Sequence, residues 1–135
     1  MRLKLLALFL ISNSLFGLAS SVDTLMVVSK SMNKSIANIV ILPDNYASQK
    51  EKFSVLYLLH GAGGDYRSWL SKAPGIKKYA DKYNIIIVCP DGGGTSWYFD
   101  SPIDTSMRYE TYVAKELINA IDKKYNTSKS NTNRA

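Results

Sequence analysis

Two glycine-rich segments hold the residues whose types and spacing best suit chemistry, and each follows an apolar run. The first segment is His60-Gly61-Ala62-Gly63-Gly64, directly after Phe53–Leu59, and the second is Asp91-Gly92-Gly93-Gly94, after Ile85–Cys89. Glycine at the end of a strand serves one of three purposes. It lets the backbone bind phosphate, it presents bare N–H groups to a developing oxyanion, or it permits a tight turn with positive φ.

The spacing in both segments excludes the two common phosphate loops. A Walker loop requires Gly-Lys-Ser or Gly-Lys-Thr, which does not occur, and Tyr66 and Trp97 stand where a dinucleotide fingerprint needs its third glycine. The order of apolar strand, His-Gly-x-Gly-Gly and nearby Trp69 instead matches the oxyanion loops of lipases and esterases. We therefore interpret the first segment as an oxyanion loop rather than as a tight turn alone.

The counts of histidine and cysteine limit the other reactions open to this chain. There is one histidine, His60, and one cysteine, Cys89, so a histidine-rich metal site, a four-cysteine zinc site and an intramolecular disulfide are excluded. Any base chemistry that uses histidine falls to His60. No metal and no cofactor are expected.

The apolar pattern predicts one α/β domain, as suits a length of 135 residues. Strands that alternate with helices indicate a sandwich whose sheet is mostly parallel and begins with an antiparallel hairpin. Ligands bind such sheets at the carboxyl ends of the strands, where both glycine segments fall. The predicted strands are 22–31, 35–42, 53–59 and 85–89, with a hairpin turn at Met32-Asn33-Lys34 between the first two. The predicted helices are 75–83, which Asn84 closes, and 106–124, with a further helical turn at 68–71. Candidate N-caps of the last helix are Asp104, Thr105 and Ser106.

Further motifs follow in a specific order between about Lys52 and Lys124. They are Leu58-Leu59-His60-Gly61-Ala62-Gly63-Gly64-Asp65, Trp69, Val88-Cys89-Pro90-Asp91-Gly92-Gly93, Ser96-Trp97-Tyr98, Tyr109-Glu110-Thr111-Tyr112-Val113 and Glu116-Leu117. In these motifs the sequence resembles the Putative esterase family of the α/β-hydrolase fold, which includes esterase D, feruloyl and acetylxylan esterases and mycolyltransferases. The resemblance implies a partial three-layer α/β-hydrolase sandwich and a serine hydrolase of carboxylic esters, with small acyl or carbohydrate-linked esters as substrates.

The resemblance also implies roles for individual residues. The backbone N–H of Ala62 is the first oxyanion donor, with His60, Gly61 and Gly63 shaping its loop, while Trp97 and Tyr98 either line the substrate pocket or pack in the core. Members of the fold use a serine on a Gly-x-Ser-x-Gly elbow, then an acid, then a histidine. No serine here has glycine on both sides at that spacing, since Ser96 follows Gly94 but precedes Tyr98. The chain is therefore expected to be the N-terminal part of an esterase, without the triad and inactive alone.

Other interpretations stay open beside this one. The sequence also offers other catalytic residue types: His60 as a base, Cys89 as a nucleophile, and Asp91, Asp100 and Asp104 as paired glycosidase acids. Loop orientation, an inert packed thiol, and turn or cap roles explain the same residues. At the level of the whole chain, the alternatives are a secreted, non-catalytic carbohydrate-binding module and an enzyme completed by a second polypeptide.

The N-terminus has the pattern of a secretory signal. A basic start with Arg2 and Lys4 precedes the apolar run Leu5–Ile11, and Gly17-Leu18-Ala19 supplies small residues for cleavage. We expect a signal peptide over residues 1–19, a domain over 20–135, no stable membrane anchor, and a secreted or periplasmic location. Lys plus Arg number 17 against 11 acids, a net charge of +6. The positive residues are scattered, so no nucleic-acid partner is expected.

Overall fold

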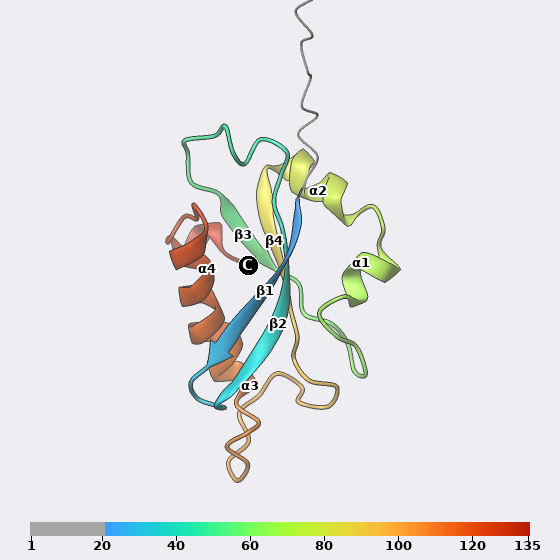
Figure 1. Cartoon of the computed structure of the whole chain (residues 1–135), viewed down its shortest axis with the longest axis vertical. Coiled ribbons are helices and arrows are strands. Elements are labelled where there is room, and N and C mark those ends of the chain that lie inside the picture. Colours follow the sequence, from blue (N-terminus) through green and yellow to red (C-terminus); the bar gives the residue numbers. More distant parts are fainter. Residues whose placement is uncertain (1–20) are drawn as a thin grey trace, which may run out of the picture.

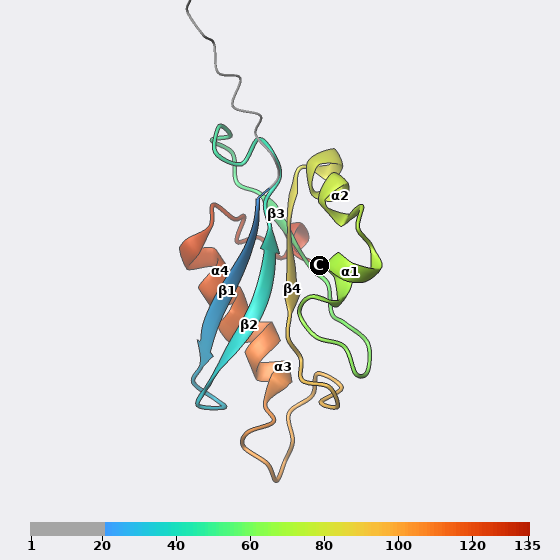
Figure 2. The same cartoon turned by 45° about the vertical axis from the view of Figure 1, so that its right-hand side comes forward.

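The computed structural model describes residues 21–135, so the predicted signal peptide lies outside the described residues. Four strands form a single sheet in the order β1-β2-β4-β3. They are β1 (Val22–Ser29), β2 (Lys34–Ile41), β3 (Ser54–Tyr57) and β4 (Ile85–Pro90). The sheet lies between two layers of helices (Figures 1 and 2), which confirms the predicted α/β class.

The predicted N-terminal hairpin is confirmed, but the rest of the sheet is mixed rather than mostly parallel. β1 pairs with β2 in antiparallel register, and Asn33 in the connecting turn has a φ of 49°, in the left-handed region that asparagine tolerates. β2 then pairs antiparallel with β4, and β3 with β4 is the single parallel pair among the described strands. The hairpin supplies two of the four strands, which is why the parallel share is small.

Helices α1 (Ser68–Lys72) and α2 (Ile76–Tyr83) lie on one face of the sheet, as predicted within two residues. The apolar side of α2, formed by Ile76 and Ala80, packs on the face of the sheet that carries Ile39, Ile41 and Ile87. Asn84 ends α2 in the left-handed conformation with a φ of 52°. β4 therefore begins directly after α2 and runs back through the core.

The opposite face is covered by one long helical segment, which begins later than predicted. It consists of α3 (Tyr109–Thr111), the π-helix η1 (Tyr112–Leu117) and α4 (Ile118–Lys124). The expected caps at Asp104, Thr105 and Ser106 do not serve it. Asp100, nine residues before Tyr109, accepts hydrogen bonds from the amide (3.0 Å) and hydroxyl (2.6 Å) of Thr111 instead.

β3 is shorter and less buried than its apolar sequence predicts. Leu56 and Tyr57 are half-buried, because β3 is the outer strand of the described sheet. Residues 126–135 run beside it: the Ala135 amide donates to the Val55 carbonyl (3.1 Å), and the Tyr57 amide donates to the Ala135 carbonyl (2.7 Å). A largely buried ion pair between Arg134 and Asp122, 2.9 Å apart, ties this segment to α4. The polar segment at 125–135 is thus part of the fold.

Glu116 of the π-helix connects the helical layer to the hairpin. Its carboxylate accepts hydrogen bonds from the Ser29 hydroxyl (2.6 Å), the Ser31 amide (2.9 Å) and the Ser31 hydroxyl (3.2 Å). Burial alone would raise the pKa of Glu116, but these donors together hold it below its ordinary value. The ionised carboxylate therefore stabilises the folded state.

We expect Glu116→Gln to lower the free energy of unfolding by about 1–2 kcal/mol at neutral pH. Because folding lowers this pKa, the stabilisation is complete above about pH 4.3 and is lost as the pH falls through the folded-state value. Denaturant unfolding across this range should show the difference between the two proteins shrinking in acid. Glu110→Gln, at an exposed site on α3, is the matched control, and a pH-independent difference would contradict the assignment.

Candidate active site

The two glycine loops meet at the carboxyl ends of β3 and β4, at the lower right of the sheet in Figure 1. The Gly63 amide donates to the Gly94 carbonyl (3.0 Å), and the Gly92 amide donates to Nε2 of His60 (2.9 Å). Between the loops lies a cavity of about 210 Å³ lined by residues 60–62, 93–95, 97 and 98. Larger cavities of about 400, 420 and 230 Å³ contain no residue of either glycine loop, and one of about 310 Å³ contains only Asp91 of the second loop.

His60 holds both loops in place through its two ring nitrogens. Because Nε2 accepts the Gly92 N–H, Nδ1 carries the ring proton and donates it to the Gly61 carbonyl, 2.9 Å away. The side chain is buried, with 7% of its surface exposed. Both nitrogens are thus engaged in loop contacts, which suits a positioning role and leaves neither nitrogen free to act as a base.

The amide of Ala62 differs from those of the two residues that follow it. Gly63 donates its N–H to Gly94, and Gly64 donates its N–H to the Gly61 carbonyl (3.0 Å). Within the described residues the Ala62 N–H has no acceptor, and Ala62 is exposed at the cavity. A free backbone donor on a fixed loop is what an oxyanion hole requires.

Glycine is needed at two places in the first loop. Gly63 has a φ of +71°, where a side chain would strain the backbone. A Cβ at Gly64 would lie 2.9 Å from Oγ of Ser68 and 3.0 Å from Nδ1 of His60. The loop can therefore fold tightly against both His60 and α1.

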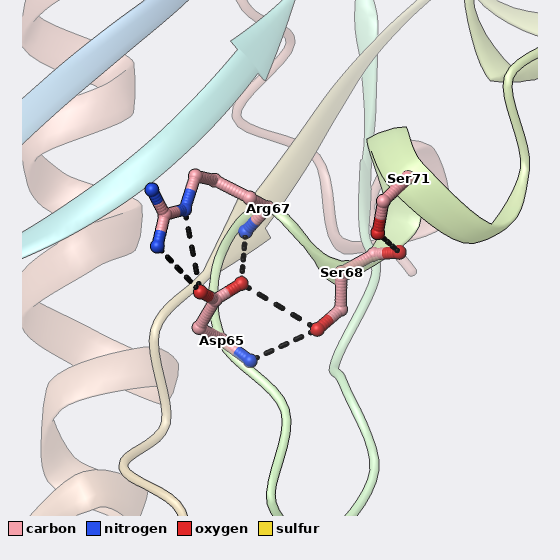
Figure 3. A network of polar contacts seen from close by, with 4 residues as sticks. All are labelled: Asp65, Arg67, Ser68 and Ser71. Carbon is pink, nitrogen blue, oxygen red and sulfur yellow. Dashed lines mark hydrogen bonds and ion pairs between the residues drawn. The ribbon is translucent and has the colours of Figure 1, made fainter.

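A polar network fixes the end of the first loop to α1 (Figure 3). The Asp65 carboxylate accepts from the backbone amide of Arg67 (2.8 Å) and from its guanidinium (3.0 Å), and the Asp65 amide donates to the Ser68 hydroxyl (2.9 Å). The hydrogen bond from the Arg67 side chain is the largest cause that lowers the pKa of Asp65. The side chains of Asp65 and Ser68 therefore stabilise the loop through these hydrogen bonds.

The second loop presents an exposed tryptophan beside the cavity. Trp97 has 78% of its surface exposed, whereas Tyr98 is half-buried and its hydroxyl accepts the His60 N–H (3.0 Å). The hydroxyl of buried Ser96 donates to the Gly92 carbonyl and accepts the Tyr98 amide (3.0 Å). Ser96 thus shapes the turn. These contacts were not predicted, and the closeness of Ser96 to the glycine run is the one sequence feature that points to them.

The remaining candidates have structural partners. Burial raises the pKa of the Cys89 thiol to about 12, which makes it unreactive. The Asp91 carboxylate accepts a hydrogen bond from the Gly93 amide (2.8 Å), and the Asp104 carboxylate accepts from the amide (2.8 Å) and hydroxyl (2.7 Å) of Ser106.

Within residues 21–135, no three His, Cys, Asp or Glu side chains lie close enough to share a metal ion. No described helix is both long and apolar enough to cross a bilayer.

Comparison with solved structures defines the class of protein. A ferulic acid esterase superposes with a TM-score of 0.75 at 32% identity, covering 89% of this chain and 48% of that one. The fluorophosphonate-binding serine hydrolase F of Staphylococcus aureus superposes with a TM-score of 0.74 at 20% identity, covering 85% and 45%. The fold is therefore that of the α/β-hydrolase esterases. Residues 29–135 match the family described as Putative esterase, and the chain belongs to that family.

Two curated relatives agree with this family. An esterase of Mycobacterium tuberculosis is 34% identical over 91 residues, which cover 65% of this chain and 20% of the relative. An acetyl esterase of Caldicellulosiruptor saccharolyticus is 31% identical over 97 residues, which cover 67% of this chain and 35% of the relative. The chain thus spans about a fifth to a third of the length of these relatives.

Proposed function

We propose that these 135 residues form the oxyanion-loop part of a serine hydrolase of carboxylic esters. The observation that carries the proposal is the free N–H of Ala62. It donates no hydrogen bond to any described residue, whereas the N–H groups of Gly63 and Gly64 both donate to backbone carbonyls. In this role the Ala62 N–H donates to the oxygen that becomes negative when the ester carbonyl is attacked. The loop is held rigid beforehand, so little reorganisation is needed during the reaction.

The nucleophile of the proposed reaction is a serine outside these residues. None of the serines of this chain has glycine at both the −2 and +2 positions. A Gly-x-Ser-x-Gly elbow, an acid and a histidine, with the N–H after the serine as second oxyanion donor, would complete the site. Below, "the completed enzyme" means these residues together with the polypeptide that carries that elbow. Attack by its serine would form an acyl-enzyme and release the alcohol, and water would then release the acid.

The proposed substrates are small acyl esters or esters linked to carbohydrate. Trp97 and Tyr98 both line the cavity, and the exposed indole of Trp97 offers a flat apolar surface to an aryl or sugar group. The relatives named acetyl esterase and ferulic acid esterase support this substrate range. No cofactor takes part in the proposed reaction.

We expect Trp97→Ala to raise the KM of the completed enzyme for its preferred ester by about 3- to 10-fold, with a smaller effect on kcat. Methyl ferulate, p-nitrophenyl acetate and acetylated xylan are the substrates to compare. Tyr79→Ala removes an exposed aromatic side chain on α2 and is the control that should change nothing. No hydrolysis of any of these esters by the completed enzyme would reject the proposed function.

The second candidate is a secreted carbohydrate-binding module without catalysis. The exposed aromatic side chains of Trp97 (78%) and Phe99 (50%) favour it, since such rings can stack on sugar rings. Sugar binding by the 135-residue chain, together with no hydrolysis by the completed enzyme, would support this alternative.

Export of the protein is proposed from its first residues alone. The basic start, the apolar run Leu5–Ile11 and the small residues before Ser20 indicate cleavage near Ala19. N-terminal sequencing of protein recovered outside the cytoplasm should begin near Ser20. Recovery of exported protein that still begins with Met1 would contradict this proposal.

A further inference from the structure

Trp97 and Tyr98 share an unusual backbone conformation beside the cavity. Their φ angles are 55° and 56°, both in the left-handed region that residues other than glycine rarely adopt, and they are consecutive. Such a conformation persists only where the surroundings hold it. The contacts of these two residues therefore indicate what the turn is for.

Tyr98, and not Trp97, makes the contacts that hold the turn. Its hydroxyl accepts the His60 N–H (3.0 Å), and its own amide donates to the Ser96 hydroxyl (3.0 Å). Its ring occupies the space that a side chain at Gly92 would need, because a Cβ there would lie 2.2 Å from Cε1 of Tyr98. Burial raises the pKa of Tyr98 to about 12, so the phenol stays neutral.

These contacts form a closed network of hydrogen bonds across the two loops. Tyr98 bonds to the His60 amide, the His60 ring bonds to the Gly92 amide, and Ser96 bonds both to the Gly92 carbonyl and to the Tyr98 amide. Ala62 lies two residues after His60, and Trp97 directly precedes Tyr98. This one network thus determines where both the Ala62 N–H and the Trp97 indole lie.

We propose that Tyr98 is a positioning residue, which fixes the oxyanion donor of Ala62 relative to the substrate-contacting face of Trp97 through the amide of His60. The proposal rests on the proposed function for its kinetic consequence. It separates two residues that the sequence places in one substrate-binding role. Both line the cavity, but in this proposal Trp97 binds the substrate, whereas Tyr98 acts through its contacts with the loops.

The first test uses Tyr98→Phe in the 135-residue chain, because this change removes the phenol oxygen and keeps the ring. By NMR, the amide hydrogen of His60 should exchange about five- to tenfold faster, the factor that matches the loss of one neutral hydrogen bond. The amide hydrogen of Gly92 should also exchange faster, because the His60 ring that accepts it is held less firmly. The ¹⁵N shifts of the His60 ring should also move, because the ring is held less firmly against the Gly92 amide that donates to its Nε2. Gly92→Ala, which displaces the Tyr98 ring, should accelerate the same amides.

Tyr79→Phe, on the exposed face of α2, is the matched control and should leave these signals unchanged. Unchanged exchange at His60 and Gly92 in Tyr98→Phe would overturn the proposal. This measurement needs no catalysis, so it decides the role of Tyr98 even if the proposed esterase function fails.

The second test separates positioning from substrate contact by kinetics in the completed enzyme. Tyr98→Phe should lower kcat by about 10- to 100-fold, because small displacements of a catalytic group have effects of that size, while KM changes less than about twofold. Trp97→Ala should show the opposite pattern. An increase of KM at constant kcat in Tyr98→Phe would show that Tyr98 contacts the substrate and would overturn the proposal.

Discussion

Replacing Ala62 by proline should reduce the kcat of the completed enzyme by about 10²- to 10³-fold, because proline has no N–H and the oxyanion loses one of its donors. The two loop amides that follow Ala62 cannot replace it. Gly63 and Gly64 already donate their N–H groups to the carbonyls of Gly94 and Gly61. KM should change little, since the donor acts mainly in the transition state.

Ala62→Gly is the control for this prediction, because it keeps the N–H and removes only a methyl group that is exposed to solvent. Its kcat should stay within a few-fold of the parent value. Thermal unfolding of both variants shows whether proline has disturbed the loop itself. A kcat for Ala62→Pro close to that of the parent, in a protein that remains folded, would remove Ala62 from the oxyanion hole.

Local sequence signals predicted most of the fold well. The hairpin turn at Asn33 and the end of α2 at Asn84 both adopt positive φ, as asparagine often does. The apolar spacing in residues 76–83 predicted the helix α2, of which Ile76 and Ala80 are buried, whereas Tyr79 and Tyr83 are exposed. These features depend on contacts between residues close in the sequence, which is why they can be recognised without the structure.

Features that depend on distant residues could not be predicted. The long helical segment starts at Tyr109, and the carboxylate that binds its first turn comes from Asp100, eleven positions before Thr111, and not from the expected caps at Asp104, Thr105 and Ser106. The burial of β3 depends on what lies beside it, and in the described residues one side of it carries only the segment 126–135. Neither neighbour has a local signal in the sequence.

The candidate site shows the same division. The glycine pattern predicted the loop that carries Ala62, because tight turns and bare amides both require glycine. The role of Tyr98 was not predicted, since it depends on a hydrogen bond with His60 across 38 positions in the chain. The sequence grouped Tyr98 with Trp97 by adjacency, whereas one is half-buried and the other is exposed.

Labelling with a fluorophosphonate probe tests most directly whether these residues supply the oxyanion loop and not the nucleophile. The 135-residue chain should show no labelling and no hydrolysis of p-nitrophenyl acetate above a protein blank, since it has no serine on an elbow and only one of two proposed oxyanion donors. The completed enzyme should show both activities, and replacing its elbow serine by alanine should abolish both. Labelling of a serine within the 135-residue chain itself, with serine-dependent hydrolysis, would contradict the proposed division of the site.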